Sequence, residues 1–402
     1  MHRLRPRRSN SIANSNQNAR ATGLVRFAAL LAVPVCLAWP VRAEPPDGPN
    51  AEELVRQLGD LRFSVRERAT EQLVRIGSDA LPALDAGARH RDREIRYRSG
   101  RILTIVRKND FQRRLEAFAS DARGEKDHGL PGWRAFRDAF GVSTASRSLF
   151  VEMVRAEPAL FQSLDEGPKE AAFTLDNRTL AIQQPAAQVG GEVISLGTVA
   201  AMLFVMTEGG VEPSDQASNF VLSSCFQGSF DKALSDGPNR DLVRKILGKA
   251  IEQSHDWPAY TAIRLALRYD MGEGLKPALR TFEGGQNVNI VYIRQFAILA
   301  IGRFGDRSHT DVLEPLLDDP TPCVPAQAIN KQMTFETQLR DIALAVLWKL
   351  HGQDPQNHGF GDRVQEDPQL VFHPSTLGFP GDAERQAAIR EWHAFRKAAP
   401  NP

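Results

Sequence analysis

The stretch VRERATEQLVRIG, residues 65–77, decides the fold of this chain. Its apolar residues recur at intervals of three and four, at Val65, Ala69, Leu73 and Ile76. At about 100° per residue they fall within an arc of roughly 80° on one side of a helix, and that side must be buried. Arg66 follows the first apolar residue, and Gly77 follows the last, where a residue without a Cβ most easily ends a helix.

The same pattern returns three times further along the chain. The corresponding positions, each with its arginine, are Ile95, Arg96, Ser99, Leu103 and Val106, then Ile293, Arg294, Ala297, Ile301 and Phe304, and finally Leu339, Arg340, Ala343, Leu347 and Leu350. Such recurrence predicts an array of helical repeats. Because Arg107 stands where a terminating glycine is expected, the second of these helices should continue through Phe111 and Leu115.

An apolar run that contains proline marks the helix accompanying several of these repeats. The runs lie at 81–84 with Pro82, at 275–279 with Pro277 and at 313–317 with Pro315. Proline is tolerated in the first turn of a helix, where its missing N–H leaves no helical hydrogen bond unmade. A proline-bearing first helix and an arginine-bearing second helix together predict antiparallel helix pairs.

In this order of helices, residues 51–107 and 259–352 resemble HEAT repeats of the armadillo-like class. The resemblance implies a right-handed α-solenoid of stacked helix pairs, a fold that usually serves as a binding scaffold. It also implies a polar ladder between neighbouring repeats, in which the matching arginines are Arg66, Arg96, Arg294 and Arg340. With its leader, its segment 130–133 and its tail 378–382, the chain resembles exported bacterial HEAT-repeat proteins, and this wider resemblance implies no particular activity.

We therefore expect an all-α fold in several parts. The parts are HEAT-like repeats at 51–120, degenerate helical repeats at 130–258, HEAT-like repeats again at 259–352, and an irregular segment with a capping helix at 353–402. The capping helix, at 382–397, should cover the open end of the solenoid with Ala387, Ile389, Trp392 and Phe395. A strand near 189–194 is the alternative to a fully helical middle part.

The first 43 residues have the pattern of a signal peptide. A basic region without acidic residues precedes an apolar run of about 13 residues, and Ala43 supplies a small residue at the expected cleavage site. The run is shorter than the ~20 residues of a membrane-spanning helix, so an uncleaved anchor is the weaker alternative. We expect cleavage after Ala43, a linker at 44–50, and a periplasmic or secreted protein with no integral membrane segment left.

Removal of this leader changes the charge of the protein. Seven arginines and no acidic residue would be lost, which leaves 43 of the 50 basic residues against 49 acidic ones and moves the net charge from +1 to −6. A mildly acidic protein has no general attraction for nucleic acid. Two cysteines would remain, Cys225 and Cys323, and export permits a disulfide between them as readily as two free thiols.

One loop carries the residue types of a metal site. His351, Asp354, His358, Asp362 and His373 lie within about two dozen residues, and histidine with carboxylate is compatible with a divalent metal. No helical spacing fixes their geometry, so we interpret the segment as a polar loop. The sequence predicts neither a bound metal nor another cofactor.

Two further clusters have a functional and a structural interpretation. Residues 89–114 hold ten basic side chains against three acidic ones, and Arg91, Arg98 and Arg101 on one helix face would form a patch for an acidic partner or simply a solvated face. Trp133, Phe136 and Phe140 lie on one helical stripe, which favours a core over an aromatic anchor for a peptide.

The sequence contains no convincing catalytic motif. The functional prediction therefore rests on the helical repeats. A row of second helices lines a long surface suited to a helix or an extended peptide. We predict a non-enzymatic scaffold for a protein or peptide partner. The alternative is an enzyme, or an accessory subunit of an enzyme complex, that uses loop 351–373 with or without a metal; self-association in the envelope is a third possibility.

Overall fold

The computed structural model describes residues 50–121, 126–184, 194–226, 228–283, 290–329 and 332–398. The expected leader at 1–43 lies outside these residues, and so does nearly all of the linker at 44–50. The strand considered near 189–194 also falls outside them except for Ile194, which belongs to no strand. Residues 51–402 form one structural unit.

The N-terminal part consists of two helix pairs around one small apolar core. Its helices are α1 (Ala51–Gln57), α2 (Phe63–Ile76), α3 (Leu81–Gly87) and α4 (Arg93–Ser120). Pro82 lies in the first turn of α3, as predicted. The Asp92 carboxylate begins α4 by accepting hydrogen bonds from the backbone N–H groups of Glu94 and Ile95. The predicted continuation of α4 through Phe111 and Leu115 is confirmed, and both side chains are buried.

All the regular elements among the described residues of the middle part are helices, as expected from the sequence. Its helices are α5 (Trp133–Phe140), α6 (Thr144–Ala156), α7 (Pro158–Glu166), α8 (Pro168–Gln183), α10 (Leu196–Met206), α11 (Asp215–Ser224), α12 (Gly228–Asp236) and α13 (Arg240–Gln253). Helix α10 is buried from Gly197 to Val205, which explains why its sequence is apolar without a polar face. Trp133 and Phe136 are buried, so the core interpretation of that stripe is confirmed.

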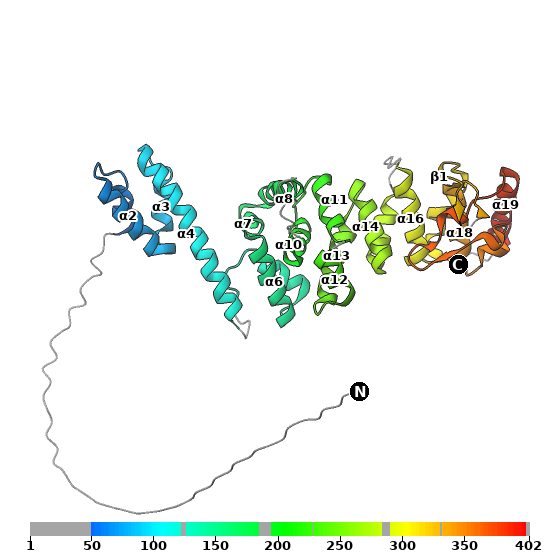
Figure 1. Cartoon of the computed structure of the whole chain (residues 1–402), viewed down its shortest axis with the longest axis horizontal. Helices are drawn as coiled ribbons and strands as arrows, with labels where there is room; N and C mark the ends of the chain where they lie inside the picture. Colours follow the sequence, from blue (N-terminus) through cyan, green and yellow to red (C-terminus); the bar gives the residue numbers. More distant parts are fainter. Residues whose placement is uncertain are drawn as a thin grey trace, which may run out of the picture. The chain divides into compact units, whose positions relative to one another are not determined.

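The C-terminal part continues with α14 (Asp256–Tyr269), α15 (Leu275–Arg280), α16 (Val291–Phe304), α17 (Thr310–Leu313), α18 (Leu339–Leu350) and α19 (Asp382–Ala398). Helices α11, α14, α16 and α18 contact one another in that order (Figure 1). Helices α10, α13 and α15 form a second succession of contacts, and α13 and α15 each pack against the helix that follows in the chain. The described chain is thus all-α in its main architecture.

Short strands interrupt the helices of the C-terminal part, and the sequence patterns did not predict these strands. Three antiparallel pairs form, β1 (Pro322–Val324) with β4 (Thr337–Gln338), β2 (Ala328–Ile329) with β3 (Gln332–Met333), and β5 (Glu366–Asp367) with β6 (Val371–Phe372). The first two pairs lie between the expected first and second helices of the last repeat. Strands of two or three residues are too short to show an alternating pattern.

Two expected core positions are corrected. Ile76 is 37% exposed, because it is the last residue of α2 and lies beyond the neighbouring helices. Ala387 is exposed on α19, whereas Ala388 is buried, since a shift of one residue turns the side chain by about 100°. The apolar residues at the first position of each predicted repeat are covered, with Val65 half-buried and Ile95, Ile293 and Leu339 buried.

Candidate binding surface

Helix α14 is buried on every side but one. Its buried residues are Pro258, Ala259, Thr261, Ala262, Ile263, Leu265, Ala266 and Leu267. The remaining side carries Trp257, Tyr260, Arg264 and Arg268, which follow one another at three and four residues and therefore lie in one line along the helix. Trp257 is 46% exposed, although an indole offers a large apolar area to bury.

Aromatic rings from the neighbouring elements extend this line. The rings of Trp257 and Tyr260 are 6.5 Å apart, and Phe296 of α16 meets Tyr260 edge-on at 5.6 Å. Tyr292, one turn before Phe296, is 61% exposed. Phe226, which follows α11, is half-buried on the other flank. We call these residues the α14 stripe, comprising Trp257, Tyr260, Arg264, Arg268, Phe226, Tyr292 and Phe296.

Arg264 is the one cation of the stripe with no anionic partner among the described residues. Its guanidinium carbon lies 5.3 Å from the ring centres of both Phe226 and Tyr260 and 5.9 Å from that of Phe296. In the described part of the chain it has no hydrogen bond and no ion pair. An arginine held by the faces of aromatic rings keeps its in-plane N–H groups available, and these groups match a carboxylate.

Arg268 differs from Arg264 because its guanidinium is already paired with a carboxylate of the protein, that of Asp231. It donates to Asp231 at 3.2 Å, and the Tyr269 hydroxyl donates to the same carboxylate oxygen at 2.6 Å. Burial is the main cause that raises the pKa of Tyr269, followed by this hydrogen bond to Asp231. Tyr269 therefore remains a neutral donor, and Asp231 is engaged on this side of α14.

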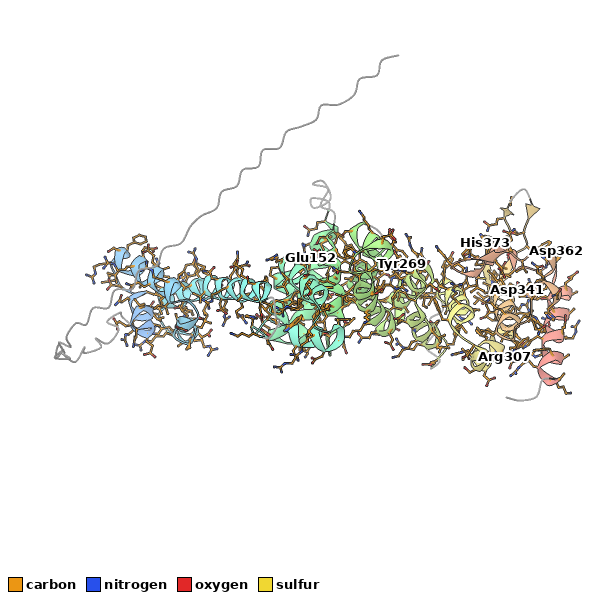
Figure 2. All side chains as sticks on the ribbon, turned by 90° about the horizontal axis from the view of Figure 1, so that it is seen from below. Glu152, Tyr269, Arg307, Asp341, Asp362 and His373 are labelled. Atoms are coloured by element: carbon orange, nitrogen blue, oxygen red, sulfur yellow. The ribbon has the colours of Figure 1, made fainter. Side chains whose placement is uncertain are left out.

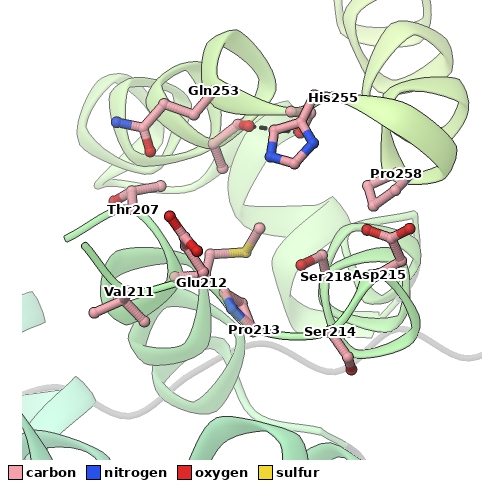
Figure 3. A pocket seen from close by; sticks show the side chains of 13 residues that line it. Thr207, Val211, Glu212, Pro213, Ser214, Asp215, Ser218, Gln253, His255 and Pro258 are labelled. Carbon is pink, nitrogen blue, oxygen red and sulfur yellow. Dashed lines mark hydrogen bonds between the residues drawn. The ribbon is translucent and has the colours of Figure 1, made fainter. Parts of the chain in front are cut away.

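A cavity of about 570 Å³ opens near the N-terminal end of α14 (Figure 3). Four helix ends meet there, namely the C-terminal ends of α10 and α13 and the N-terminal ends of α11 and α14. Its polar lining includes Glu212, Asp215 and Ser218. His255, on the same cavity, lies 2.8 Å from the carboxylate of Asp256 through its Nδ1.

The four predicted ladder arginines contact backbone or acidic groups near the starts of their helices. Arg66 donates to the carbonyl oxygen of Asp60 at 2.7 Å, and Arg96, thirty residues later, donates to that of His90 at the same distance. Arg66 also lies 3.6 Å from Glu94 of α4, and Arg294 pairs with Asp319 at 2.5 Å. Arg340 pairs with Asp382 of α19 at 2.7 Å. Three of the four therefore join one helix to the next part of the chain.

Of the three arginines considered for a basic patch or a solvated face, Arg91, Arg98 and Arg101, only the last two lie on α4. Arg91 lies in the turn before α4 and not on the helix. Arg98 is held by Glu94 at 2.6 Å and by Glu67 at 2.8 Å, so its charge is neutralised within the protein. Arg101 remains exposed beside the ring of Tyr97. Glu94 lies four residues before Arg98, as the sequence spacing shows, but the spacing could not show that Glu67 of α2 also faces Arg98.

The histidines of loop 351–373 each have a different partner. Nε2 of His351 lies 2.9 Å from the Thr310 hydroxyl, and Nδ1 of His373 lies 2.7 Å from that of Ser375. His358 stacks on Trp348 at 3.6 Å and meets Glu391 at 2.8 Å. Figure 2 labels His373 and Asp362 at separate places in the C-terminal part. Within the described residues, no three His, Cys, Asp or Glu side chains gather closely enough to hold a metal ion.

The sequence patterns did not predict that the residues of the α14 stripe form an exposed surface. Its signal was present in the spacing of Trp257, Tyr260, Arg264 and Arg268, but aromatic residues at helical spacing also describe a core helix. Among the described residues, no helix combines the length and the apolar character that crossing a membrane requires. No protein-family model matches the chain, and no curated protein matches it in sequence.

Proposed function

We propose that this protein is a non-enzymatic protein-binding scaffold that acts outside the cytoplasm. In this proposal its helix pairs form a HEAT-like α-solenoid, and the α14 stripe binds a segment of a partner protein. The leader-like residues 1–43 support an exported location. The ordered contacts from α11 through α14 and α16 to α18 support the solenoid, because each helix of this row packs against the next helix of the row.

The observation that carries the proposal is the composition of the α14 stripe. Tryptophan, tyrosine and arginine are the residues most enriched where binding energy concentrates in protein interfaces. Here they lie along the one side of α14 that, among the described residues, is not buried. An exposed line of this kind gains stability when a partner removes it from water, at about 25 cal/mol per Å² of apolar surface.

The charge of the stripe indicates the partner segment. Arg264 has N–H groups to donate and no carboxylate facing it within the described chain, while Asp231 on the same side is already bound by Arg268 and Tyr269. A glutamate or aspartate flanked by apolar side chains complements this arrangement: its carboxylate meets Arg264, and its apolar neighbours cover Trp257 and Tyr292. The interaction requires no reaction and no cofactor.

Capture of the partner from native envelopes tests the proposal. The tagged full chain is expressed in its own cells, crosslinked in place and purified, alongside an Arg264→Glu variant. We expect a reproducible protein partner whose recovery falls at least tenfold in the variant, since loss of a central interface arginine typically costs about 2 kcal/mol or more. Arg155→Glu is the matched control, because Arg155 is exposed on α6 and has no partner among the described residues. Equal recovery by Arg264→Glu and the native chain would refute the role of the stripe.

A further inference from the structure

The exposed apolar side chains of the later helices gather on one row. Helix α8 contacts α11, α11 contacts α14, and α14 contacts α16 (Figure 1). From the start of α8 to the end of the described chain, the large apolar side chains that remain exposed all belong to this row. They are Phe173 and Leu180 on α8, Trp257 on α14, and Ile290 and Tyr292 at the start of α16. The α14 stripe is therefore part of a larger apolar surface.

The exposed residues of α8 and α14 lie on the same side of this row. Helices α10, α13 and α15 pack against the row from its inner side. Leu175 of α8 and Ala262 of α14 are completely buried in the core that the row shares with α10 and α13. Phe173 and Leu180 lie about 160° and 140° from Leu175, and Arg264 lies about 160° from Ala262. All three residues therefore point away from the inner helices, on one outer face.

The outer face closes toward the C-terminal end of the row. Helix α18, which follows α16, is buried from Asp341 to Trp348, and Leu299 of α16 is buried as well. Toward α8 the face stays open, because Gln216 of α11 is exposed and Phe220 is half-buried. A partner segment that follows exposed apolar surface from the α14 stripe therefore runs toward α8.

The exposed side of α8 suits an apolar residue. Phe173, Asn177 and Leu180 follow one another at four and three residues, so they lie in one line along the helix. Phe173 is 61% exposed and Leu180 is 49% exposed, and Asn177 between them is exposed and uncharged. Because this line carries no charge, it offers nothing to an ionic group. An apolar side chain gains by removing Phe173 and Leu180 from water.

We infer that the partner segment continues from the α14 stripe across α11 to α8 as an extended chain. The inference rests on the proposed scaffold function and adds a second anchor to it. An acidic residue of the segment meets Arg264, and an apolar residue further along covers Phe173 and Leu180. Two helix spacings of about 8 to 10 Å separate α8 from α14. At about 3.5 Å per residue, an extended segment needs about five residues or more to span them.

Photocrosslinking from α8 tests the inference. p-Benzoylphenylalanine is incorporated at Phe173 or at Trp257 of the tagged full chain, and mass spectrometry identifies the crosslinked peptides after irradiation of native cells. We expect both positions to crosslink one continuous segment of the same protein, at residues about five to ten apart. Val142 is the matched control, because it is 58% exposed but lies between α5 and α6, outside the row. Position 142 should not give this crosslink.

Several results would overturn the inference. Position 173 could give no crosslink while position 257 does, or it could crosslink a different protein or a second copy of this chain. Crosslinks from positions 173 and 257 to separate parts of the partner would also contradict a single continuous segment. The same crosslink from position 142 as from position 173 would show that α8 is not recognised specifically.

Substitution on α8 measures the contribution of this anchor. A Phe173→Ser/Leu180→Ser double variant should lower recovery of the partner about fivefold or more, because the partner then covers less apolar surface. Both side chains are exposed, so the fold should be kept, and the midpoint of urea unfolding checks this. Val142→Ser should leave recovery unchanged. Equal recovery by the double variant and the native chain, or an equal loss in Val142→Ser, would refute the anchor.

The two proposals can fail separately. A crosslink from position 257 and loss of capture in Arg264→Glu, without any effect at α8, would leave the scaffold standing and remove the α8 anchor. No crosslink from either position 173 or position 257 would withdraw both proposals. A crosslink from position 173 alone would remove the α14 stripe from the interface, and the continuous segment with it.

Discussion

The guanidinium of Arg385, on the last helix, binds both oxygens of Asp341, a carboxylate that is completely buried at the start of α18. The distances are 2.6 Å from Nε to Oδ1 and 3.3 Å from Nη2 to Oδ2. Asp382 joins the pair to Arg340 by accepting from both arginines. This network fastens α19 to α18, and Trp392 of α19 is also buried.

Breaking one half of this pair should destabilise the C-terminal part. Arg385→Ala leaves the Asp341 carboxylate buried without its partner, and we expect the free energy of unfolding to fall by about 3 kcal/mol. The Asp341→Ala/Arg385→Ala double variant should lose less than the sum of the two single losses, because no unpaired charge remains. Urea unfolding of the four proteins in this cycle measures the coupling, and strictly additive losses would show that the pair contributes no mutual stabilisation.

The ring of His351 should make the same region sensitive to acid. Burial, followed by the charges of Arg396 and Arg307, lowers the pKa of His351, while Glu314 opposes them. The folded protein thus favours the neutral ring, whereas an unfolded histidine gains its proton as the pH falls through about 6.5. Stability should therefore decrease below that pH until the lowered native pKa is passed.

Comparison of two histidine variants isolates this contribution. His351→Gln should flatten the fall in unfolding free energy between pH 7.5 and pH 5.5, by no more than about 1.4 kcal/mol per pH unit. His393→Gln, an exposed histidine on α19, should keep the native slope. A native slope in His351→Gln would assign the acid sensitivity to other groups.

Arg147 should hold the end of α4 to the middle part. It donates to the carbonyl oxygens of Phe118 and Asp121 at 2.7 and 3.0 Å, and its guanidinium carbon lies 4.0 Å from the centre of the Phe118 ring. Arg147→Met keeps the stem but leaves these helix-end carbonyls without the donor, so we expect a loss of about 2 kcal/mol in urea unfolding. Arg155→Met, on the exposed side of the same helix, should cost less than about 0.5 kcal/mol. Similar losses in both variants would count against this role.

Cys225 and Cys323 should resist alkylation in the folded protein. They are not bonded to each other. Burial raises the pKa of Cys225 well above its usual value and, with Asp341 nearby, raises that of Cys323 to about 12. Only the thiolate reacts, so iodoacetamide at pH 8 should modify both residues after unfolding and neither before. Mass spectrometry of the peptides checks this, and a peptide that joins the two cysteines would contradict it.

Helical periodicity predicted most of the helices, but it did not predict which of their side chains other helices cover. The capping helix expected at 382–397 is α19 (Asp382–Ala398), and the extension of α4 past Arg107 is present. Trp133 and Trp257 both lie in the first turn of a helix, with an aromatic residue three positions later. Yet Trp133 is 2% exposed and Trp257 is 46% exposed. The difference arises from helices distant in sequence that cover one and not the other, and no local pattern contains that information.

For the candidate sites, too, local sequence patterns predicted some features, whereas others depend on residues that are distant in the sequence. Spacing along the chain identified Arg66, Arg96, Arg294 and Arg340 as a related set, because each follows the same apolar position. It could not identify the cavity, whose lining runs from Met206 to Pro258 and comes from four helices. Glu67, which pairs with Arg98, and the partners of His351 and His358 likewise lie on other elements, so these candidate residues make contacts within the fold.

The most direct test of the binding surface places a photoreactive residue on it. p-Benzoylphenylalanine is incorporated at Trp257 or Tyr292 of the α14 stripe, or at Tyr97 of α4, which is exposed to a similar extent. After irradiation of native cells, we predict the same crosslinked partner from positions 257 and 292 and none from position 97. Crosslinking from position 97 alone, or no crosslink from either stripe position, would contradict the account.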